Sequence, residues 1–282
     1  MSISNKEIQT WAIEKVRSTL PVRKFEGHKG TFGTALLLAG SRDMPGAVLL
    51  SGRAAMRSGV GKLVIGTEEE VIPSIVPVLP EATYLRNGLL KTAKQQVDFS
   101  AYKAIACGPG IEPNKEMEEA VGEMLRSSCP VILDAGALAE RYYKRKKAPI
   151  ILTPHPGEFS KISGVEVEKL QSNRPHYASE WAIKLGVTIV LKGNATITAF
   201  PDGEVWENPT GNSALAKGGT GDTLTGMMLG MLCCHQECKH AILNAVYLHG
   251  ACADKWTEEY SPHTLLAHEM TDMLPQVWKK FE

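Results

Sequence analysis

Short apolar runs alternate with longer segments of helical periodicity along most of the chain, and this pattern predicts an α/β fold. The apolar run 34–39, which ends in Gly40-Ser41, is typical of a strand buried on both faces of a sheet. Strands separated by helices form a mainly parallel sheet with helices on both faces, so we predict three layers. The expected strands are 34–39, 62–66, 104–107, 131–134, 150–153 and 187–191, and the expected helices lie near 46–59, 115–127, 174–185, 222–233, 239–254 and 265–274.

Two further elements are predicted from local signals. Ser4 and Glu7 have the spacing of a capping box, which predicts a first helix over 4–18. Residues 196–200 and 204–206 flank a Pro-Asp-Gly turn, which predicts a β-hairpin.

Length and composition favour a single globular domain. The chain has 282 residues without repeats or linker-like segments, so we expect residues 1–282 to form one domain with a large core. Lys plus Arg and Asp plus Glu both number 31, which argues against a nucleic-acid surface. Neither a signal peptide nor an apolar stretch of membrane-spanning length is evident, and six cysteines suggest reduced thiols. We expect a cytoplasmic homo-oligomer without nucleic-acid or membrane partners.

The segment 233–240 is rich in residues that bind metals, with three cysteines and two histidines. It lacks a second Cys-x-x-Cys pair, and the adjacent Cys233 and Cys234 would point in different directions on a helix. A structural role is therefore favoured over a metal site.

The strongest chemical signal is the glycine-dense run Gly218-Gly-Thr-Gly-Asp222, which we call the anion loop. It precedes an apolar segment expected to be a helix, and a helix N-terminus presents free N–H groups and partial positive charge to an anion. Asp222 is unusual, because phosphate repels a carboxylate. From the loop alone, Asp222 is either a helix cap or a base acting on a hydroxyl that attacks the phosphate.

Polar, glycine-bearing motifs follow several of the predicted strands. In parallel sheets the carboxyl ends of the strands meet at one edge, where chemistry usually occurs. The motifs are therefore expected to lie together with the anion loop. They are Gly40-Ser41, Gly108-Pro-Gly110, Asp134, His155-Pro-Gly-Glu158 and Lys192-Gly193.

The anion loop resembles the Gly-x-Gly-Asp signature of the ribokinase-like superfamily, and the whole set resembles one family within it, the nucleotide-dependent NAD(P)H-hydrate dehydratases. The match runs from about 29 to 230, and 247–250 extend it. Many relatives are expected to carry Asp-Ala-Asp where this chain has Asp134-Ala-Gly136. The matching motifs are Lys29-Gly-x-x-Gly33, Gly40-Ser41, Pro45-Gly-Ala47, Gly108-Pro-Gly110, Leu152-Thr-Pro-His-Pro-Gly-Glu158, Leu191-Lys-Gly193, Asn208-Pro-Thr-Gly-Asn212 and the anion loop.

The resemblance implies a ribokinase-like fold and a repair reaction. ADP or ATP, with Mg²⁺, would phosphorylate the hydroxyl of a hydrated nicotinamide ring, and loss of phosphate would restore NADH or NADPH. Asp222 would take the hydroxyl proton while the anion loop holds the phosphoryl group. The implied substrate-binding residues are Ala47, Gly110, His155 and Asp222. The implied nucleotide-binding residues are Lys192, Gly193, Asn194, Ala195, Thr196, Gly219, Thr220 and Gly221.

Each of these assignments has a structural alternative. Glu158 would organise Mg²⁺ through water, or it is only an acidic residue in the first turn of a helix. His155 is a substrate contact or a structural histidine, and residues 192–196 are a nucleotide loop or an ordinary turn. Ala47 and Gly110 leave room for substrate or serve close packing.

Two other functions compete with the repair reaction. A small-molecule kinase acting on a sugar or a vitamin-precursor alcohol would use the same loop and Asp222. The motif 153–158 differs from that of the sugar kinases, which argues against this alternative. A non-catalytic nucleotide sensor would have no use for the carboxylate of Asp222 beside a phosphate.

Overall fold

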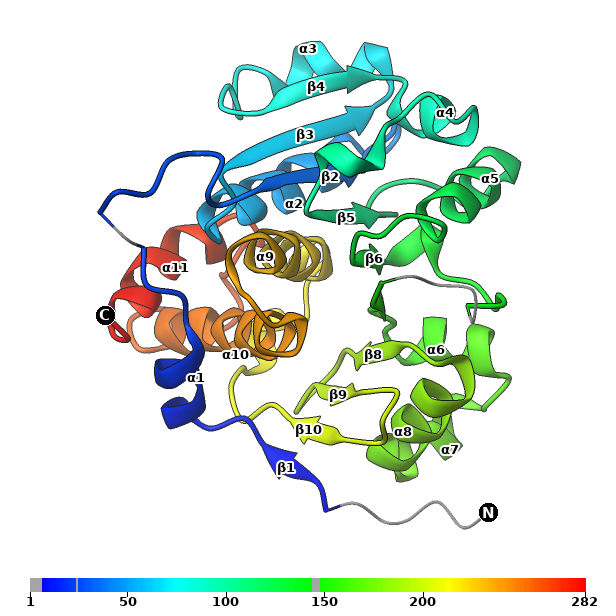
Figure 1. Ribbon diagram of the computed structural model, residues 1–282. Coiled ribbons are helices and arrows are strands. Elements are labelled where there is room, and N and C mark those ends of the chain that lie inside the picture. The colour runs from blue at the N-terminus through cyan, green and yellow to red at the C-terminus, as the bar shows by residue number, and fades with distance from the viewer. Residues whose placement is uncertain (1–6, 24, 144–147) are drawn as a thin grey trace.

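The computed structural model describes residues 7–23, 25–143 and 148–282. Within them, the core is a ten-stranded sheet of order β1-β10-β9-β8-β7-β6-β5-β2-β3-β4 (Figure 1). The strands are β1 (Gln9–Thr10), β2 (Thr34–Leu38), β3 (Lys62–Thr67), β4 (Thr83–Arg86), β5 (Ala104–Cys107), β6 (Val131–Leu133), β7 (Ile150–Leu152), β8 (Thr188–Leu191), β9 (Ile197–Ala199) and β10 (Val205–Glu207). The helices are α1 (Ile13–Thr19), α2 (Pro45–Arg57), α3 (Ile72–Ile75), α4 (Gly88–Ala93), α5 (Lys115–Met124), α6 (Pro156–Ser163), α7 (Val167–Ser172), α8 (Arg174–Leu185), α9 (Thr220–Cys234), α10 (Cys238–Thr257) and α11 (Met270–Lys279).

The sheet is parallel except at β9, which runs antiparallel to β8 and β10. The predicted hairpin is therefore confirmed as β9–β10. The parallel strands β2, β5, β6, β7 and β8 lie in one contiguous part of the sheet, so their carboxyl ends form a common edge. The sequence motifs that follow these strands meet at that edge.

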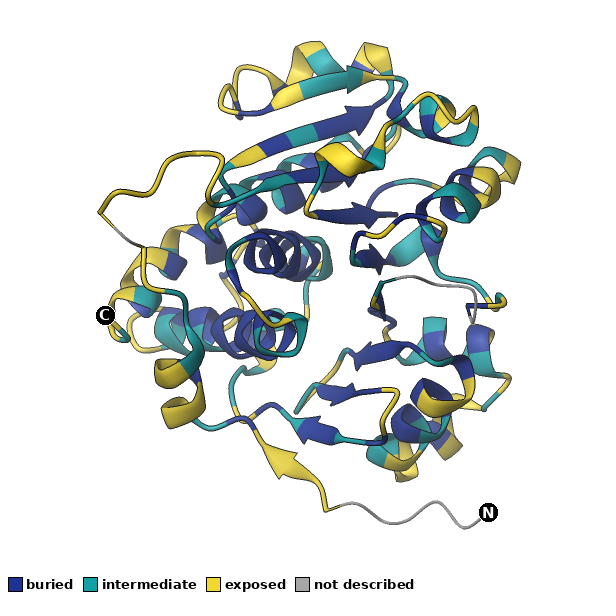
Figure 2. Cartoon of the chain, viewed as in Figure 1, coloured by how far each residue is buried: buried dark blue, intermediate teal, exposed yellow. Residues whose placement is uncertain are grey.

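Side chains of the central strands alternate between two hydrophobic cores, one on each face of the sheet. Leu37 of β2 packs in a cluster with residues of α2, α9, α10 and α11. Its neighbours Leu36 and Leu38 pack in a second cluster with residues of α5, α6 and α8, including the buried Trp181. Figure 2 shows the buried residues following the strands and the inner sides of these helices. The predicted three-layer fold is confirmed.

The N-terminus differs from the predicted helix over 4–18. Gln9–Thr10 form β1, which pairs with β10 at the edge of the sheet, and α1 begins only after it. The next residue, Trp11, is buried and donates its indole N–H to Asn244 Oδ1 at 2.9 Å. Strand pairing and the anchored indole outweigh the local helical spacing. Ser4, the proposed cap, lies outside the described residues.

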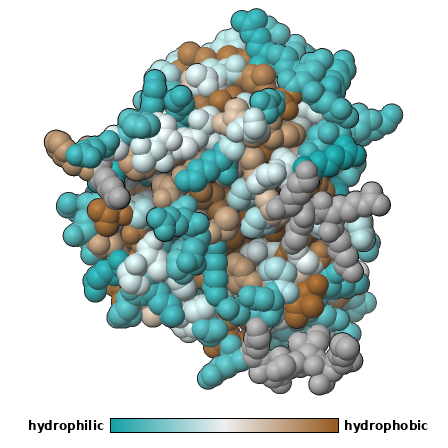
Figure 3. Space-filling view, viewed as in Figure 1, coloured by the Kyte–Doolittle hydropathy of each residue, from teal (hydrophilic) through white to brown (hydrophobic). Residues whose placement is uncertain are grey.

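The surface is polar at its margins and carries some exposed apolar side chains. On the face in Figure 3, hydrophilic residues cover most of the periphery, while hydrophobic residues gather nearer the centre. The most exposed large hydrophobic side chains of the described residues are Val22 and Phe25, between α1 and β2. No helix in the described ranges combines the length and apolar character needed to span a membrane.

Helices α2 and α9 pack with their backbones in close approach. A Cβ atom at Gly226 would lie 2.0 Å from the Ser51 carbonyl oxygen, and one at Gly230 would lie 2.4 Å from the Ala55 carbonyl oxygen. Glycine at both positions therefore lets α9 lie directly on α2. This contact also fixes the N-terminus of α9, where the anion loop lies.

Gly226→Ala should lower the free energy of unfolding by about 1–3 kcal/mol, because the added methyl group forces α9 away from α2. Urea unfolding at equilibrium measures the change. Gly122→Ala is the matched control, since a Cβ there in α5 meets nothing within 4 Å. The control should be neutral or stabilising by about 0.5–1 kcal/mol. Equal losses in both variants would contradict the close-packing argument.

Candidate active site

The anion loop leads directly into α9, with Gly219 as the N-cap residue. Gly219 has φ of 90°, and a Cβ there would lie 2.5 Å from Leu50 Cδ1 of α2, so glycine is required. Gly221, by contrast, does not have a positive φ. Asp222 lies in the first helical turn and is not the cap, which removes the capping alternative.

Asp222 is a carboxyl group whose environment suits a base near neutral pH. Burial is the largest cause that raises the pKa of Asp222, to about 7, and the charge of Asp134 adds to it. The positive charge of Lys192 acts in the opposite direction, and the negative charge of Glu158 raises the pKa further. A carboxyl group that titrates near pH 7 can accept a proton and release it again.

Lys192, directly after β8, brings a positive charge to the anion loop. Its Nζ donates to Asp134 Oδ1 at 2.8 Å and lies 3.7 Å from Glu158 Oε2. A Cβ at Gly221 would lie 3.3 Å from Lys192 Nζ, so the ammonium lies against the loop backbone. Burial alone would lower the pKa of Lys192, but Asp134, Glu158 and Asp222 raise it above its ordinary value. Lys192 is therefore a permanent cation in the site.

His155 and Glu158 form a reciprocal cap at the start of α6. His155 Nδ1 accepts from the backbone N–H groups of Gly157 and Glu158, and Glu158 Oε2 accepts from the His155 N–H at 2.7 Å. Both residues therefore have a structural role: His155 caps α6, and Glu158 is an acidic residue in its first turn. They leave His155 Nε2 on an exposed ring at 3.5 Å from Glu158 Oε1. A contact between substrate and His155 remains a prediction.

A cavity of about 430 Å³ adjoins the anion loop. It is bounded by the loop after β8, the segment 208–216 and the start of α9. Of the predicted nucleotide-binding residues, only Gly219 does not line it. The predicted residues in its wall are Lys192, Gly193, Asn194, Ala195, Thr196, Thr220 and Gly221.

Arg174 holds the backbone of the loop after β8, a role that was not predicted from the sequence. Its guanidinium donates to the carbonyl oxygens of Leu191 at 2.9 Å and Lys192 at 3.2 Å, and also to that of Asn194. Gly193, with φ of 144°, passes so close that a Cβ would lie 2.9 Å from Arg174 Nη2. Arginine at the first position of a helix gives no sequence signal for this role, because its targets are backbone oxygens.

Helix α10 supports the opposite side of the cavity through two residues without assigned roles in the sequence argument. Asp254 accepts from the Gly211 N–H and from Asn212 Nδ2, both at 2.9 Å. His249 is buried, with Nε2 2.9 Å from the Thr220 carbonyl oxygen. Burial lowers the pKa of His249 to about 4, so the ring is neutral at pH 7 and Nε2–H donates to that oxygen. These contacts fix the positions of the segment around Asn212 and of the anion loop relative to α10.

The predicted substrate residues Ala47 and Gly110 are neighbours. A Cβ at Gly110 would lie 2.6 Å from the Ala47 Cβ and 3.3 Å from the Gly40 Cα. Close packing therefore explains why all three residues are small, which was the alternative to substrate binding. Ala47 also lies in the first turn of α2, one turn before Leu50, which contacts Gly219. The substrate role of Ala47 and Gly110 remains a prediction.

Gly136 explains the departure from the expected Asp-Ala-Asp motif. A Cβ at this position would lie 1.8 Å from the Ile111 carbonyl oxygen, so this backbone has no room for a second carboxylate. Asp134 itself is 1 % exposed and holds Lys192.

The residues of the site suit a magnesium ion that arrives with a nucleotide. Glu158 offers a carboxylate group, the type of ligand that Mg²⁺ prefers. Among the described residues, however, no group of three or more His, Cys, Asp or Glu side chains is placed to hold a metal ion. Glu158 would therefore hold Mg²⁺ through water, with the other ligands supplied by phosphate oxygens and water.

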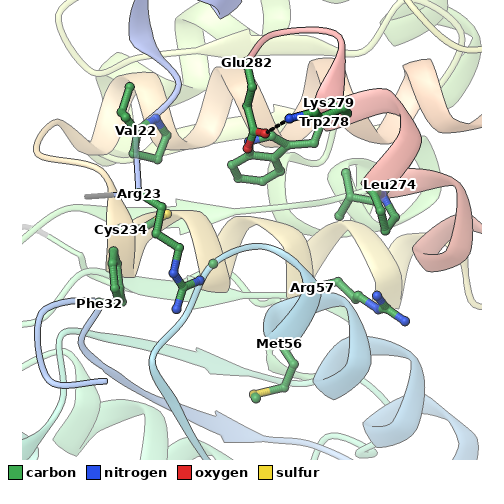
Figure 4. A pocket seen from close by; sticks show the side chains of 13 residues that line it. Val22, Arg23, Phe32, Met56, Arg57, Cys234, Leu274, Trp278, Lys279 and Glu282 are labelled. Atoms are coloured by element: carbon green, nitrogen blue, oxygen red, sulfur yellow. Dashed lines mark hydrogen bonds and ion pairs between the residues drawn. The ribbon is translucent and has the colours of Figure 1, made fainter. Parts of the chain in front are cut away.

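Two other features lie away from this edge of the sheet. In the segment 233–240, Cys234 Sγ contacts the Ser58 carbonyl oxygen, and His235 bonds with the Met231 carbonyl oxygen and Asn244. These contacts give the segment a structural role. A cavity of about 360 Å³ lies at the C-terminal ends of α2 and α9, and none of the predicted site residues lines it (Figure 4).

Comparisons with known proteins point to one family. A family model described as NAD(P)H-hydrate dehydratase matches residues 35–276. The ADP-dependent (S)-NAD(P)H-hydrate dehydratase of Bacillus subtilis (strain 168) is 65 % identical over 272 residues, which cover 96 % of this chain and 98 % of that protein.

Solved structures extend the comparison to the fold. A crystal structure of ADP/ATP-dependent NAD(P)H-hydrate dehydratase from Bacillus subtilis, co-crystallized with ATP and Mg²⁺, has a TM-score of 0.96 at 64 % identity and covers 98 % of this chain and 99 % of its own. A ribokinase-like superfamily protein from Enterococcus faecalis has a TM-score of 0.82 at 26 % identity, covering 97 % and 96 %. The predicted ribokinase-like fold is confirmed, and the chain belongs to the NAD(P)H-hydrate dehydratase family.

Proposed function

We propose that this chain uses ADP or ATP to dehydrate the (S)-hydrates of NADH and NADPH, with Asp222 as the base. The observation that carries the assignment of the base is the position of this carboxyl group, with a pKa of about 7, in the helical turn after the anion loop. The relative from Bacillus subtilis, 65 % identical, carries the name of this activity.

The proposed reaction has two steps that balance in atoms and charge. The hydroxyl oxygen of the hydrated ring attacks the terminal phosphorus of the nucleotide, the phosphoanhydride bond breaks, and the proton passes to Asp222. The lone pair of the ring nitrogen then expels phosphate, and loss of a proton from the neighbouring carbon restores the double bond. Phosphate is a far better leaving group than hydroxide, which explains why a nucleotide is consumed.

The protein contributes position and charge to the first step. The free N–H groups at the start of α9 face the migrating phosphoryl group, and Lys192 adds a fixed positive charge beside Gly221. The nucleotide occupies the cavity bounded by residues 192–196 and the segment around Asn212. Glu158 would hold Mg²⁺ through water, and the ion would supply positive charge that neutralises the phosphates.

A further cavity of about 430 Å³ supports a dinucleotide substrate over a small alcohol. It lies beyond the carboxyl ends of β2, β3 and β4, and Gly40 and Ile111 are among its lining residues. Because Gly40 adjoins Gly110, which packs against Ala47, the cavity lies next to these predicted substrate residues. We propose that it receives the half of the dinucleotide that does not react.

The products distinguish this reaction from that of a kinase. Incubation with hydrated NADH, Mg²⁺ and ADP or ATP should yield inorganic phosphate and NADH in equal amounts, with one phosphoanhydride bond cleaved per turnover. NADH is followed by absorbance and phosphate by a colorimetric assay, with the hydrate omitted as the control. Sugars and pyrimidine or thiazole alcohols should be poor substrates. Accumulation of a stable phosphate ester from one of these alcohols, with hydrated NADH untouched, would identify a kinase instead.

We also propose that residues 1–282 act as one domain in a cytoplasmic homo-oligomer. The exposed side chains of Val22 and Phe25 are compatible with burial between subunits. Light scattering coupled to size-exclusion chromatography measures the mass in solution, and a monomer would contradict this proposal.

A further inference from the structure

We propose that Asp134 is a positioning residue for phosphoryl transfer, because its carboxylate holds the Lys192 ammonium against the anion loop and ties it to the helix that carries Asp222. This inference rests on the proposed function, since it assumes that Lys192 acts on the phosphoryl group. Asp134 does not itself line the nucleotide cavity.

Both oxygens of the Asp134 carboxylate have defined partners. Oδ1 accepts from Lys192 Nζ and Oδ2 accepts from Thr225 Oγ1, each at 2.8 Å. Asp134 is 1 % exposed and Thr225 is fully buried, so water does not compete for these bonds. Thr225 lies three residues after Asp222 in α9, which places the two side chains on adjacent turns of one helix face. Asp134 therefore connects the cation and the base of the site.

The backbone around Asp134 is also fixed. Its N–H donates to the Cys107 carbonyl oxygen at 3.0 Å, and its own carbonyl oxygen accepts from the Ala137 N–H at 3.0 Å. Ala135 has φ of 47°, a conformation that an alanine adopts only at a cost in free energy. This strained residue directly follows Asp134, in the turn that positions the Asp134 carboxylate.

Asp134 limits the movement of an otherwise flexible side chain. A lysine ammonium sits on four methylene groups and has no fixed direction of its own. The short bond to Asp134 holds Lys192 Nζ near Gly221, where a Cβ would be only 3.3 Å away. A buried ion pair adds little to stability on balance, so its value here is the defined position of the charge. Misplacement of such a group by about 1 Å can cost roughly 100-fold in rate.

The charge of Asp134 also acts on Asp222. The charged groups that face Asp222 are Asp134, Lys192 and Glu158. Removal of the negative charge of Asp134 leaves the positive charge of Lys192 opposed only by Glu158 among these groups. Asp222 then holds its proton less strongly and is a weaker base.

Asp134→Asn tests the proposal with the smallest change in shape. It should lower kcat by roughly 10-fold, an intermediate loss for a displaced charge, while the affinity for ADP with Mg²⁺ holds or improves because Lys192 loses its counter-ion. Calorimetry measures ADP binding without any hydrate present. Loss of ADP binding and of thermal stability together, with kcat unchanged per folded molecule, would indicate a merely structural residue and overturn the proposal.

A double-mutant cycle with Lys192→Met tests whether Asp134 acts through Lys192. In the Lys192→Met background, Asp134→Asn should change kcat by less than about 2-fold, because the group that it positions is absent. Independent, multiplicative losses would overturn the proposal. If Asp134→Asn alone does not fold because the Lys192 ammonium has lost its closest partner, the double variant removes both charges and should recover the fold.

The pH dependence of kcat/KM gives a readout that a structural role does not move. The acidic limb should shift to lower pH in Asp134→Asn, whereas Thr225→Ser keeps the hydroxyl and should retain the wild-type limb and rate. If the acidic limb of kcat/KM in Asp134→Asn coincides with that of the wild type, the charge of Asp134 does not act on Asp222. The binding measurement uses ADP alone, and the pH profiles use hydrated NADH or, if the protein proves to be a kinase, the alcohol that it phosphorylates. If the protein does not dehydrate hydrated NADH, but the effects of Asp134→Asn and Lys192→Met still depend on each other, only the proposed function is rejected.

Discussion

Asp222→Asn should lower turnover by roughly 100-fold or more, the usual loss for a positioned base. Asparagine cannot accept the hydroxyl proton at neutral pH, so the hydroxyl must attack the phosphorus while it is still protonated. Affinity for ADP should hold or improve, because a negative charge near the phosphates is removed. Steady-state kinetics with hydrated NADH and calorimetry with ADP measure the two effects.

The raised pKa of Asp222 also predicts how kcat/KM and stability depend on pH. The pKa of Asp222 is raised to about 7, so the base form grows as the pH rises and kcat/KM of the wild type should increase through about pH 7. A raised pKa means that the folded state binds the proton more tightly than the unfolded state, so ionisation of Asp222 above pH 7 costs stability. Asp222→Asn should therefore be the more stable protein at about pH 8, and the difference should shrink as the pH falls from 7 toward 4.

Asp272→Asn serves as the matched control for the loss of a carboxylate. Asp272 of α11 pairs with Arg53 of α2 at 2.6 Å, and neither residue lines the nucleotide cavity. Its amide variant should keep normal turnover and the normal pH profile. Near-normal turnover of Asp222→Asn, or the same loss in both variants, would reject Asp222 as the base.

Elements with a clear pattern of apolar residues were predictable from the sequence, and short elements were not. The buried strand β2 and the apolar helix α9 follow from uninterrupted apolar runs and from the glycines that bound them. The segment 68–100 contains α3, α4 and β4, each of six residues or fewer, which are too short for a period to be measured. At β1 a local capping signal gave the wrong element, because pairing with β10 depends on residues almost 200 positions away.

The individual parts of the site were predictable, but not their pairings. Glycine density marked the anion loop, and the rule that chemistry occurs at the carboxyl ends of parallel strands placed Lys192 beside it. The bonds of Asp134 join residues 58 and 91 positions apart, and no local pattern contains that information. Arg174 was missed for a related reason, since its targets are carbonyl oxygens that any sequence provides.

Gly221→Val is expected to weaken both nucleotide binding and turnover, unlike Asp222→Asn. The backbone at Gly221 needs no unusual φ, so the effect comes from space: a Cβ would meet Lys192 Nζ at 3.3 Å and Lys192 Cδ at 3.9 Å. Valine adds two further methyl groups beyond that atom. These groups displace the ammonium from the loop and cover the N–H groups that face the phosphate.

We expect Gly221→Val to lower kcat/KM by roughly 100-fold, the scale for a displaced catalytic group, with a weaker affinity for ADP. Gly221→Ala places one methyl group at the contact distance and should lie between wild type and Gly221→Val in both properties. Gly122→Val, on α5 where a Cβ meets nothing within 4 Å, controls for valine in a helix and should bind ADP normally. Because Gly221 excludes side-chain atoms and Asp222 accepts a proton, only Gly221→Val should lose ADP affinity in calorimetry. Matching binding profiles for Gly221→Val and Asp222→Asn would show that this division of roles is wrong.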